Sequence, residues 1–177
     1  MNTLKSFAIA GLFLPLTAVF AESDEQLGSW SLVVGEDPST YKTVASLQQD
    51  SLATIKDENA RQELNPRLMF RCTPGDPAIS ARIDWQRFIS SFRTELGFKI
   101  DGGKFNWLKW KVDQSNKVTL SPSATDSQKL IDLVLDGEKL LVEVTPYSQS
   151  PVTVEYDLVG FSVALEKLRH FVRNNRV

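Results

Sequence analysis

Apolar and polar residues alternate in several short stretches of the chain, a two-residue period that is typical of strands with one buried face. Near the start, "WSLVV" places Trp30, Leu32 and Val34 on one face, and Gly35 ends this first predicted strand. The next stretch, "TYKTVASLQ" (40–48), predicts a second strand, with a helix as the alternative.

The segment 50–66, "DSLATIKDENARQELNP", is polar, rich in helix formers and ended by a proline. It therefore predicts a connection or a short exposed helix. After it, "PRLMFRC" (66–72) and "AISARIDW" (78–85) alternate clearly, and the turn residues of "TPGDP" separate them. These two stretches predict a β-hairpin.

Further along, "FKIDGGK" (98–104) contains an Asp-Gly-Gly turn, and "NWLKWKV" (106–112) alternates again. Trp110 belongs to the apolar face of this predicted strand. Trp107 lies on the other face, between lysines, so we expect it to face solvent or to pack beneath a neighbouring loop.

A predicted helix and two more strands follow. "TDSQKLIDLVLDG" (125–137) begins with a good capping residue, Thr125 or Asp126, and ends in glycine. "KLLVEVTPY" (139–147) and "VTVEYDL" (152–158) then alternate, with the turn-rich "SQSP" between them.

The period of the apolar residues changes within "VTVEYDLVGFSVALEKL" (152–168) from two to three or four. A strand therefore passes into an amphipathic helix, and Gly160 permits the tight corner between them. The apolar stripe of this helix has the width needed to cover one face of a sheet, and it consists of Phe161, Leu165, Leu168 and Val172.

Consecutive strands joined by hairpin-length turns predict an α+β fold. We expect an antiparallel β-sheet or sandwich, with one helix after the strand "KVTL" and a C-terminal amphipathic helix packed on the sheet. Residues 22–177 have the length of one globular domain.

The N-terminus has the features of a secretory signal peptide. One lysine precedes an apolar run that Pro15 interrupts, and the run ends in small residues before the acidic "ESDEQ". We expect cleavage after Ala21, so that residues 1–21 form the signal peptide, and no transmembrane segment after cleavage. The predicted location is periplasmic or secreted.

The charge balance argues against a nucleic-acid partner. The chain has 20 Lys and Arg against 22 Asp and Glu, and removal of Lys5 leaves 19 against 22, near −3. The basic residues are scattered, whereas nucleic-acid binding requires a concentrated basic face.

The single cysteine, Cys72, has no partner for an intramolecular disulfide. It alternates with Leu68 and Phe70 in "PRLMFRC", which indicates a buried apolar role, and a reactive or intermolecular thiol is the alternative. The only histidine, His170, falls near the end of a predicted helix, so we do not expect a catalytic Cys72–His170 pair.

No residue pattern indicates an active site, and we predict no catalytic residues, no metal site and no cofactor. One histidine and one cysteine far apart in sequence do not form a metal-ligand cluster. The turn in "FKIDGGK" lacks the hydroxyl residue that an aspartic protease would need after its aspartate. Paired carboxylates of a hydrolase remain an alternative, with candidates Asp84, Asp101, Asp157 and Glu155.

Four pieces of the sequence resemble a known family. "PRLMFRC", "IDWQRFIS", "FKIDGGKFNWLKWKVDQS" and "KLLVEVTPYSQSPVTVEYDLVGFSVALEKL" are similar to the small exported proteins associated with type VI secretion systems, the VasI-like group. The shared pattern has an "L-x-x-R-C" strand, a tryptophan strand, a "kL-x-V-x-V-x-P-Y" strand and a closing "F-D-L-x-G-x-x-x-A-L" element. It covers residues 28–172. This chain lacks the second cysteine that such proteins have near the C-terminus.

The resemblance implies a periplasmic accessory protein of a Gram-negative bacterium that binds a protein in the cell envelope and is not an enzyme. This hypothesis predicts an exposed apolar or aromatic patch. Its candidate residues are Phe105, Trp107, Trp110 and Tyr147. The alternative, an envelope hydrolase of the peptidoglycan type, predicts a cleft with converging carboxylates.

Overall fold

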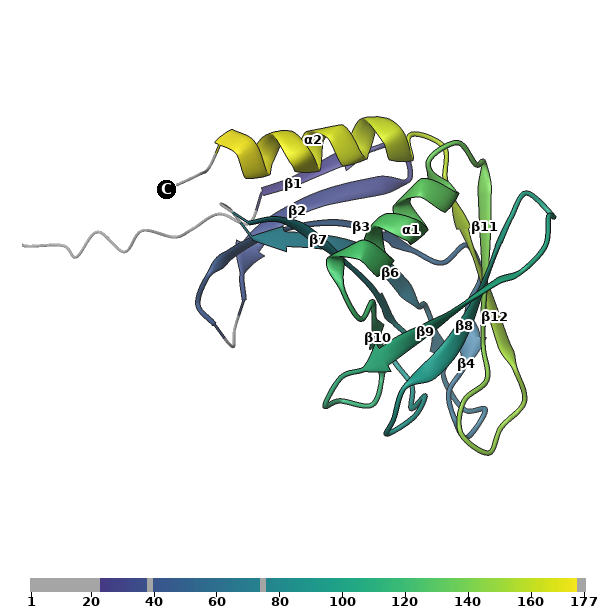
Figure 1. Cartoon of the computed structure of the whole chain (residues 1–177). Helices are drawn as coiled ribbons and strands as arrows, with labels where there is room; N and C mark the ends of the chain where they lie inside the picture. The colour runs from purple at the N-terminus through teal and green to yellow at the C-terminus, as the bar shows by residue number, and fades with distance from the viewer. Residues whose placement is uncertain (1–22, 38–39, 74–75, 175–177) are drawn as a thin grey trace, which may run out of the picture.

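The structure is a computed structural model that describes residues 23–37, 40–73 and 76–174 (Figure 1). The predicted signal peptide, residues 1–21, lies outside the described residues.

Ten strands form one antiparallel sheet in the order β1-β2-β3-β6-β7-β10-β9-β8-β11-β12. They are β1 (Ser23–Leu27), β2 (Trp30–Glu36), β3 (Thr43–Asp50), β6 (Arg67–Thr73), β7 (Asp76–Asp84), β8 (Thr94–Ile100), β9 (Asn106–Val112), β10 (Val118–Leu120), β11 (Lys139–Val144) and β12 (Val152–Asp157). A separate hairpin consists of β4 (Ile55–Lys56) and β5 (Glu63–Leu64). With the helices α1 (Ala124–Val134) and α2 (Phe161–Asn174), this architecture confirms the predicted α+β class, as a sheet and not a sandwich.

The sheet bends strongly at the short strand β10 (Figure 1). The part with β1, β2, β3, β6 and β7 lies under α2, and the part with β8, β9, β11 and β12 stands at a steep angle to it. Helix α1 follows β10 and packs on β7, inside the angle between the two parts. Ser123 caps this helix, because its Oγ accepts a hydrogen bond from the Asp126 N–H (3.2 Å); the cap therefore precedes the predicted Thr125 or Asp126.

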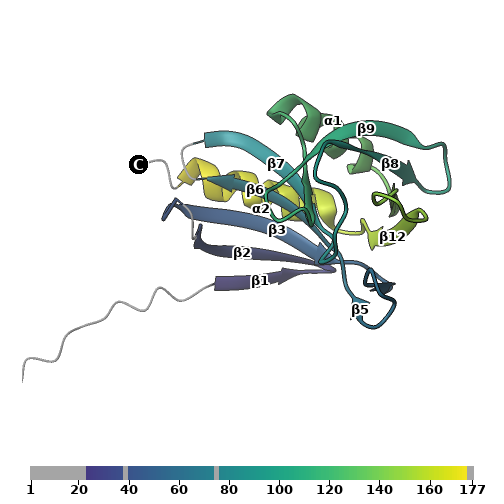
Figure 2. The ribbon, with the colours of Figure 1, turned by 90° about the horizontal axis from the view of Figure 1, so that it is seen from below.

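Helix α2 covers the first part of the sheet, as its apolar stripe predicted (Figures 1 and 2). Phe161 at the start of the helix packs against Trp30 of β2 and Phe70 of β6, with 5.0 Å between ring centroids in both pairs. Gly160, with a φ of 83°, makes the corner between β12 and α2. The buried helix residues are Phe161, Ala164, Leu165, Leu168 and Val172.

The two ends of the bent sheet are joined by hydrogen bonds. The Ser29 hydroxyl, in the β1–β2 turn, donates to Asp157 Oδ2 of β12 (2.5 Å). The Leu52 N–H, just after β3, donates to the Glu155 carbonyl of the same edge strand (2.8 Å). The last strand is therefore held against the first three.

The structure decides the uncertain elements of the N-terminal half. Residues 40–48 contribute to strand β3 and do not form a helix, and 50–66 is a connection with the β4–β5 hairpin instead of an exposed helix. The predicted hairpin of 66–72 and 78–85 is confirmed as β6 and β7. Strand β1 was not predicted, because its residues "SDEQL" are almost all polar and show no alternation.

Candidate functional site

The best candidate for a binding surface is an aromatic pair on the outer face of β8 and β9. Trp107 of β9 lies directly opposite Gly97 of β8 in the antiparallel register. Its ring is 5.4 Å from the ring of Phe105, at an interplanar angle of 31°. Half of the Trp107 surface is exposed and Phe105 is partly exposed, so both rings can be reached from solvent.

Gly97 makes room for this pair. A Cβ atom at position 97 would lie 2.8 Å from Phe105 Cδ1 and 2.9 Å from Trp107 Cη2, which is closer than atoms of this size can pack. The two rings therefore lie over the β8 backbone where a side chain would otherwise stand. This covering leaves Gly97 itself buried, and it fixes the orientation of both rings.

Charged side chains surround the aromatic pair. The Lys99 ammonium lies 5.6 Å from the centroid of the Phe105 ring, within the range of a cation–π contact. On the other side of Trp107 along β9, Lys109 forms an exposed ion pair with Glu95 of β8 (3.9 Å). An aromatic centre with a charged rim has the composition of a small protein-binding surface.

Trp110 was predicted to contribute to the exposed patch, and this prediction is wrong. The side chain is fully buried, and its ring lies 5.3 Å from that of Phe98. The reason is the alternation of β9 itself, because residues 107 and 110 point to opposite faces of the sheet.

Tyr147 is exposed, as predicted, but the structure does not bring it to the aromatic pair. Its N–H donates to the Ile89 carbonyl (2.8 Å), so Tyr147 lies beyond the end of the sheet where β8 begins. Phe105 lies toward the opposite end of β8, next to the Phe98–Asn106 pair. With 69% of its surface exposed, Tyr147 belongs to a separate surface.

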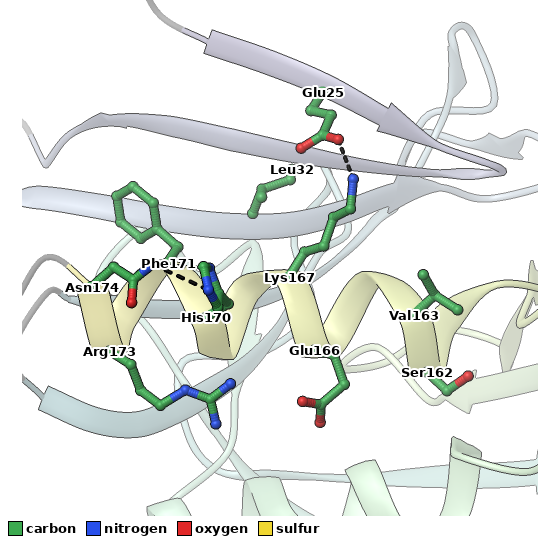
Figure 3. A pocket seen from close by; sticks show the side chains of 10 residues that line it. All are labelled: Glu25, Leu32, Ser162, Val163, Glu166, Lys167, His170, Phe171, Arg173 and Asn174. Carbon is green, nitrogen blue, oxygen red and sulfur yellow. Dashed lines mark hydrogen bonds and ion pairs between the residues drawn. The ribbon is translucent and has the colours of Figure 1, made fainter.

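A second feature, not predicted from the sequence, is a groove of about 880 Å³ along the exposed side of α2 (Figure 3). Leu32 of β2 and Phe171 of α2 give it an apolar floor, and Lys167 reaches across it to form an ion pair with Glu25 of β1. The lining residue Val163 is 62% exposed.

Several titratable groups of this groove are engaged with each other or with neighbours. Glu25 is paired with Lys167, and Glu166 accepts a hydrogen bond from Arg169 (2.9 Å). His170 shares a hydrogen bond with the Asn174 side-chain amide (3.1 Å), visible in Figure 3. No carboxylate among these residues is placed as a free base beside the imidazole.

The four carboxylates proposed for a hydrolase have structural partners. Both oxygens of Asp101 accept backbone N–H donors at the start of β11, the closest being Lys139 at 2.8 Å. Asp157 accepts from Ser29 and from the Val159 N–H, and the Ser29 hydrogen bond is the main reason why the pKa of this carboxyl is lowered.

Glu155 forms an ion pair with Lys139 (3.1 Å), and Asp84 accepts the Gln86 N–H (2.8 Å). Neither these two nor Asp101 and Asp157 line the groove along α2. The structure therefore gives these carboxylates roles in turns and strand pairing.

Cys72 points into the core, as the alternation in β6 predicted. The side chain is buried, and its thiol lies 3.8 Å from the Ala45 carbonyl, to which it donates. Burial raises the pKa of the thiol to about 11. Because His170 lies on the exposed side of α2, the two residues do not form a catalytic pair.

No family model, curated protein or solved structure matches the chain. Within the described residues, no helix is long and apolar enough to cross a membrane. The same part of the chain contains no group of three or more His, Cys, Asp or Glu residues that could hold a metal ion.

Proposed function

We propose that this chain is an exported accessory protein of the Gram-negative periplasm that binds a protein of the cell envelope, without catalysis, through the surface formed by Phe105 and Trp107. The observation that carries the proposal is the exposed aromatic pair fixed over Gly97. The signal-peptide pattern of residues 1–21 and the resemblance to type VI secretion-associated proteins support export and an accessory role.

The geometry of the pair suits binding. Tryptophan is enriched among the residues that dominate interface energies, because a large rigid ring buries much area at a small entropic cost. A ring held in place before binding also avoids part of the ordering cost of association. The rigid strands β8 and β9 provide this support better than a loop would.

Peptidoglycan hydrolysis is the less favoured hypothesis. Acid–base chemistry on a glycan needs two carboxylates that face one cleft, one of them held protonated at neutral pH. The Ser29 hydrogen bond lowers the pKa of Asp157 and favours its charged form. Asp101 is engaged by backbone N–H donors at the start of β11. None of the four candidates lines the groove along α2.

A crosslinking pull-down from intact periplasm tests the proposal. Trp107→Ala is compared with Tyr41→Ala, which removes another exposed aromatic side chain, 77% exposed, from the β2–β3 connection. We expect one specific envelope protein with the unaltered chain and with Tyr41→Ala, and its loss with Trp107→Ala. Equal recovery with both variants would contradict the proposed surface. N-terminal sequencing of the recovered chain tests export, with residue 22 as the expected first residue.

A further inference from the structure

A second groove, of about 430 Å³, lies on the side of the sheet that α2 does not cover. It lies along the outer faces of β6 and β7 and extends to the start of α1. Its polar lining includes Lys42, Arg71, Ser80, Arg82, Ser121 and Ser123. This groove is separate from the aromatic pair and from the groove along α2.

Arg82 is the unusual residue of this groove. It is half-buried in β7, its Nε atom is buried without a hydrogen-bond partner, and no hydrogen bond or ion pair of its guanidinium occurs within the described part of the chain. A guanidinium offers five donors, and leaving them unpaired in a partly desolvated position costs free energy. Its lowered pKa reflects this burial first and the neighbouring Arg71 charge second.

Two acidic residues nearby, Asp113 and Asp37, act on Arg82 through their charge but form no hydrogen bond or ion pair with its guanidinium. Asp37 forms an ion pair with Arg71, and Asp76 accepts the Ala78 N–H (2.9 Å). Asp113, whose charge acts on Arg82 more strongly than that of Asp37, accepts the Ser115 hydroxyl (2.6 Å). Among the described lining residues there are three cations and two carboxylates, so the lining itself has one excess positive charge.

The surroundings of Arg82 add further donors for an anion. Arg71 is its diagonal neighbour, because it pairs with Ser80, two residues before Arg82 in β7; diagonal neighbours of this kind are about 7–8 Å apart. On the other side, Ser123 caps α1, whose N-terminus has a partial positive charge. The N-terminus of α1 adds to the positive potential of the groove, and the unpaired Arg82 guanidinium is the group that would bind the anion directly.

We propose that this groove binds a carboxylate group, with Arg82 as the residue that pairs with it. The planar fork of a guanidinium matches the two oxygens of a carboxylate. One excess positive charge matches a singly charged group better than a phosphate dianion. The ligand is a small organic acid or the C-terminus of a peptide. Both present a carboxylate to Arg82. The inference does not depend on the function proposed for the aromatic pair.

Titration of the purified protein at constant ionic strength tests the proposal, with the Arg82 Nε–Hε signal observed by NMR. The probes are acetate, phosphate, a short acetylated peptide with a free C-terminus and the same peptide with an amidated C-terminus. We expect a saturable shift with acetate and with the peptide acid. A peptide acid that binds at least about tenfold more tightly than acetate identifies a chain terminus as the source, and equal binding identifies a small acid.

Arg82→Gln supplies the second measurement, and Arg93→Gln is the matched control because Arg93 is exposed outside the groove. We expect Arg82→Gln to weaken carboxylate binding about tenfold or more, while the melting temperature without ligand stays equal or rises because an unpaired charge is removed. Arg93→Gln should bind as the unaltered protein does. The proposal is overturned by unchanged binding to Arg82→Gln, by equal binding of acid and amide, or by saturable binding of phosphate alone.

Discussion

Trp107 lies across from Gly97, and its ring, together with that of Phe105, occupies the space where a side chain of residue 97 would stand. This relationship explains why a tryptophan on the outer face of a sheet has a fixed orientation while half of it remains exposed. Part of the ring protects the β8 backbone, and the rest is available to a partner.

Gly97→Ala should displace both rings without removing either. The glycine φ is not in the left-handed region, so alanine is compatible with the backbone, and the added methyl group acts through its clash with the rings. Overpacking of this kind costs about 1–3 kcal/mol, so we expect the free energy of unfolding in urea to fall by that amount. Glu95→Ala, on the same face of the same strand, is the control and should change it by about 0.5 kcal/mol or less. Equal stability of Gly97→Ala and the unaltered protein would contradict the described packing.

Two tryptophans of one strand should differ sharply when truncated. Trp110→Ala removes a fully buried ring and should cost about 3–5 kcal/mol of unfolding free energy. Trp107→Ala removes a half-exposed ring and should cost no more than about 2 kcal/mol. Chemical denaturation of the two variants measures both values. A larger loss for Trp107→Ala than for Trp110→Ala would show that the assignment of the two faces is reversed.

Cys72 should be nearly inert in the folded protein. A pKa of about 11, instead of 9.0, lowers the thiolate fraction near pH 8 about 100-fold, and burial adds a steric barrier. We expect slow alkylation by iodoacetamide, fast alkylation in denaturant, and no disulfide-linked dimer on a non-reducing gel. A dimer band that Cys72→Ser abolishes would place the thiol on the surface.

The raised thiol pKa also has a consequence at alkaline pH. The folded state holds the proton more tightly than the unfolded state, so this contribution to stability is complete below pH 9 and is lost as the pH rises toward 11. Cys72→Ala should therefore show a smaller decrease in unfolding free energy between pH 9 and 11 than the unaltered protein. An identical decrease would mean that the thiol pKa is not raised by folding.

The stabilisation from the Ser29–Asp157 hydrogen bond, which joins the two ends of the sheet, should depend on pH. The Ser29 hydroxyl and, next, the Val159 N–H lower the pKa of Asp157 below 3.8. The stabilisation from this charged carboxylate is present above pH 3.8 and is lost as the pH falls through the folded-state value. Asp157→Asn should reduce the acid dependence of the melting temperature, whereas Asp136→Asn, an exposed position with the same change of charge, should not. The same acid dependence in all three proteins would rule out this role of Asp157.

Local patterns predicted much of the second half of the fold. The alternation in 106–112 assigned Trp107 and Trp110 to opposite faces correctly, and the change of period at Gly160 located α2. Strand β8 was missed because Leu96, Gly97 and Phe98 are buried in succession, without alternation. Gly97 is buried on the outer face only because Phe105 and Trp107 cover it, a contact that no local pattern could indicate.

The parts of the sites that depend on long-range packing could not be predicted. Tyr147 was grouped with Trp107 as a candidate for one aromatic patch, yet its hydrogen bond to the Ile89 carbonyl holds it at the other end of β8. Arg82 lacks an ion-pair partner partly because Asp37 pairs with Arg71, a contact that joins the β2–β3 connection to β6. The exposure of Trp107, by contrast, follows from its place among lysines in one strand.

Site-specific photo-crosslinking in living cells tests the central claim most directly. A photoreactive residue replaces Lys109, beside Trp107 on the outer face of β9, or Lys129, on the exposed side of α1, as the control position. We expect one discrete adduct with an envelope protein from position 109 and none from position 129. We also expect that adding Trp107→Ala abolishes this adduct while the chain stays folded. Persistence of the adduct in Trp107→Ala, or no adduct from position 109, would contradict the claim that Phe105 and Trp107 form the binding surface.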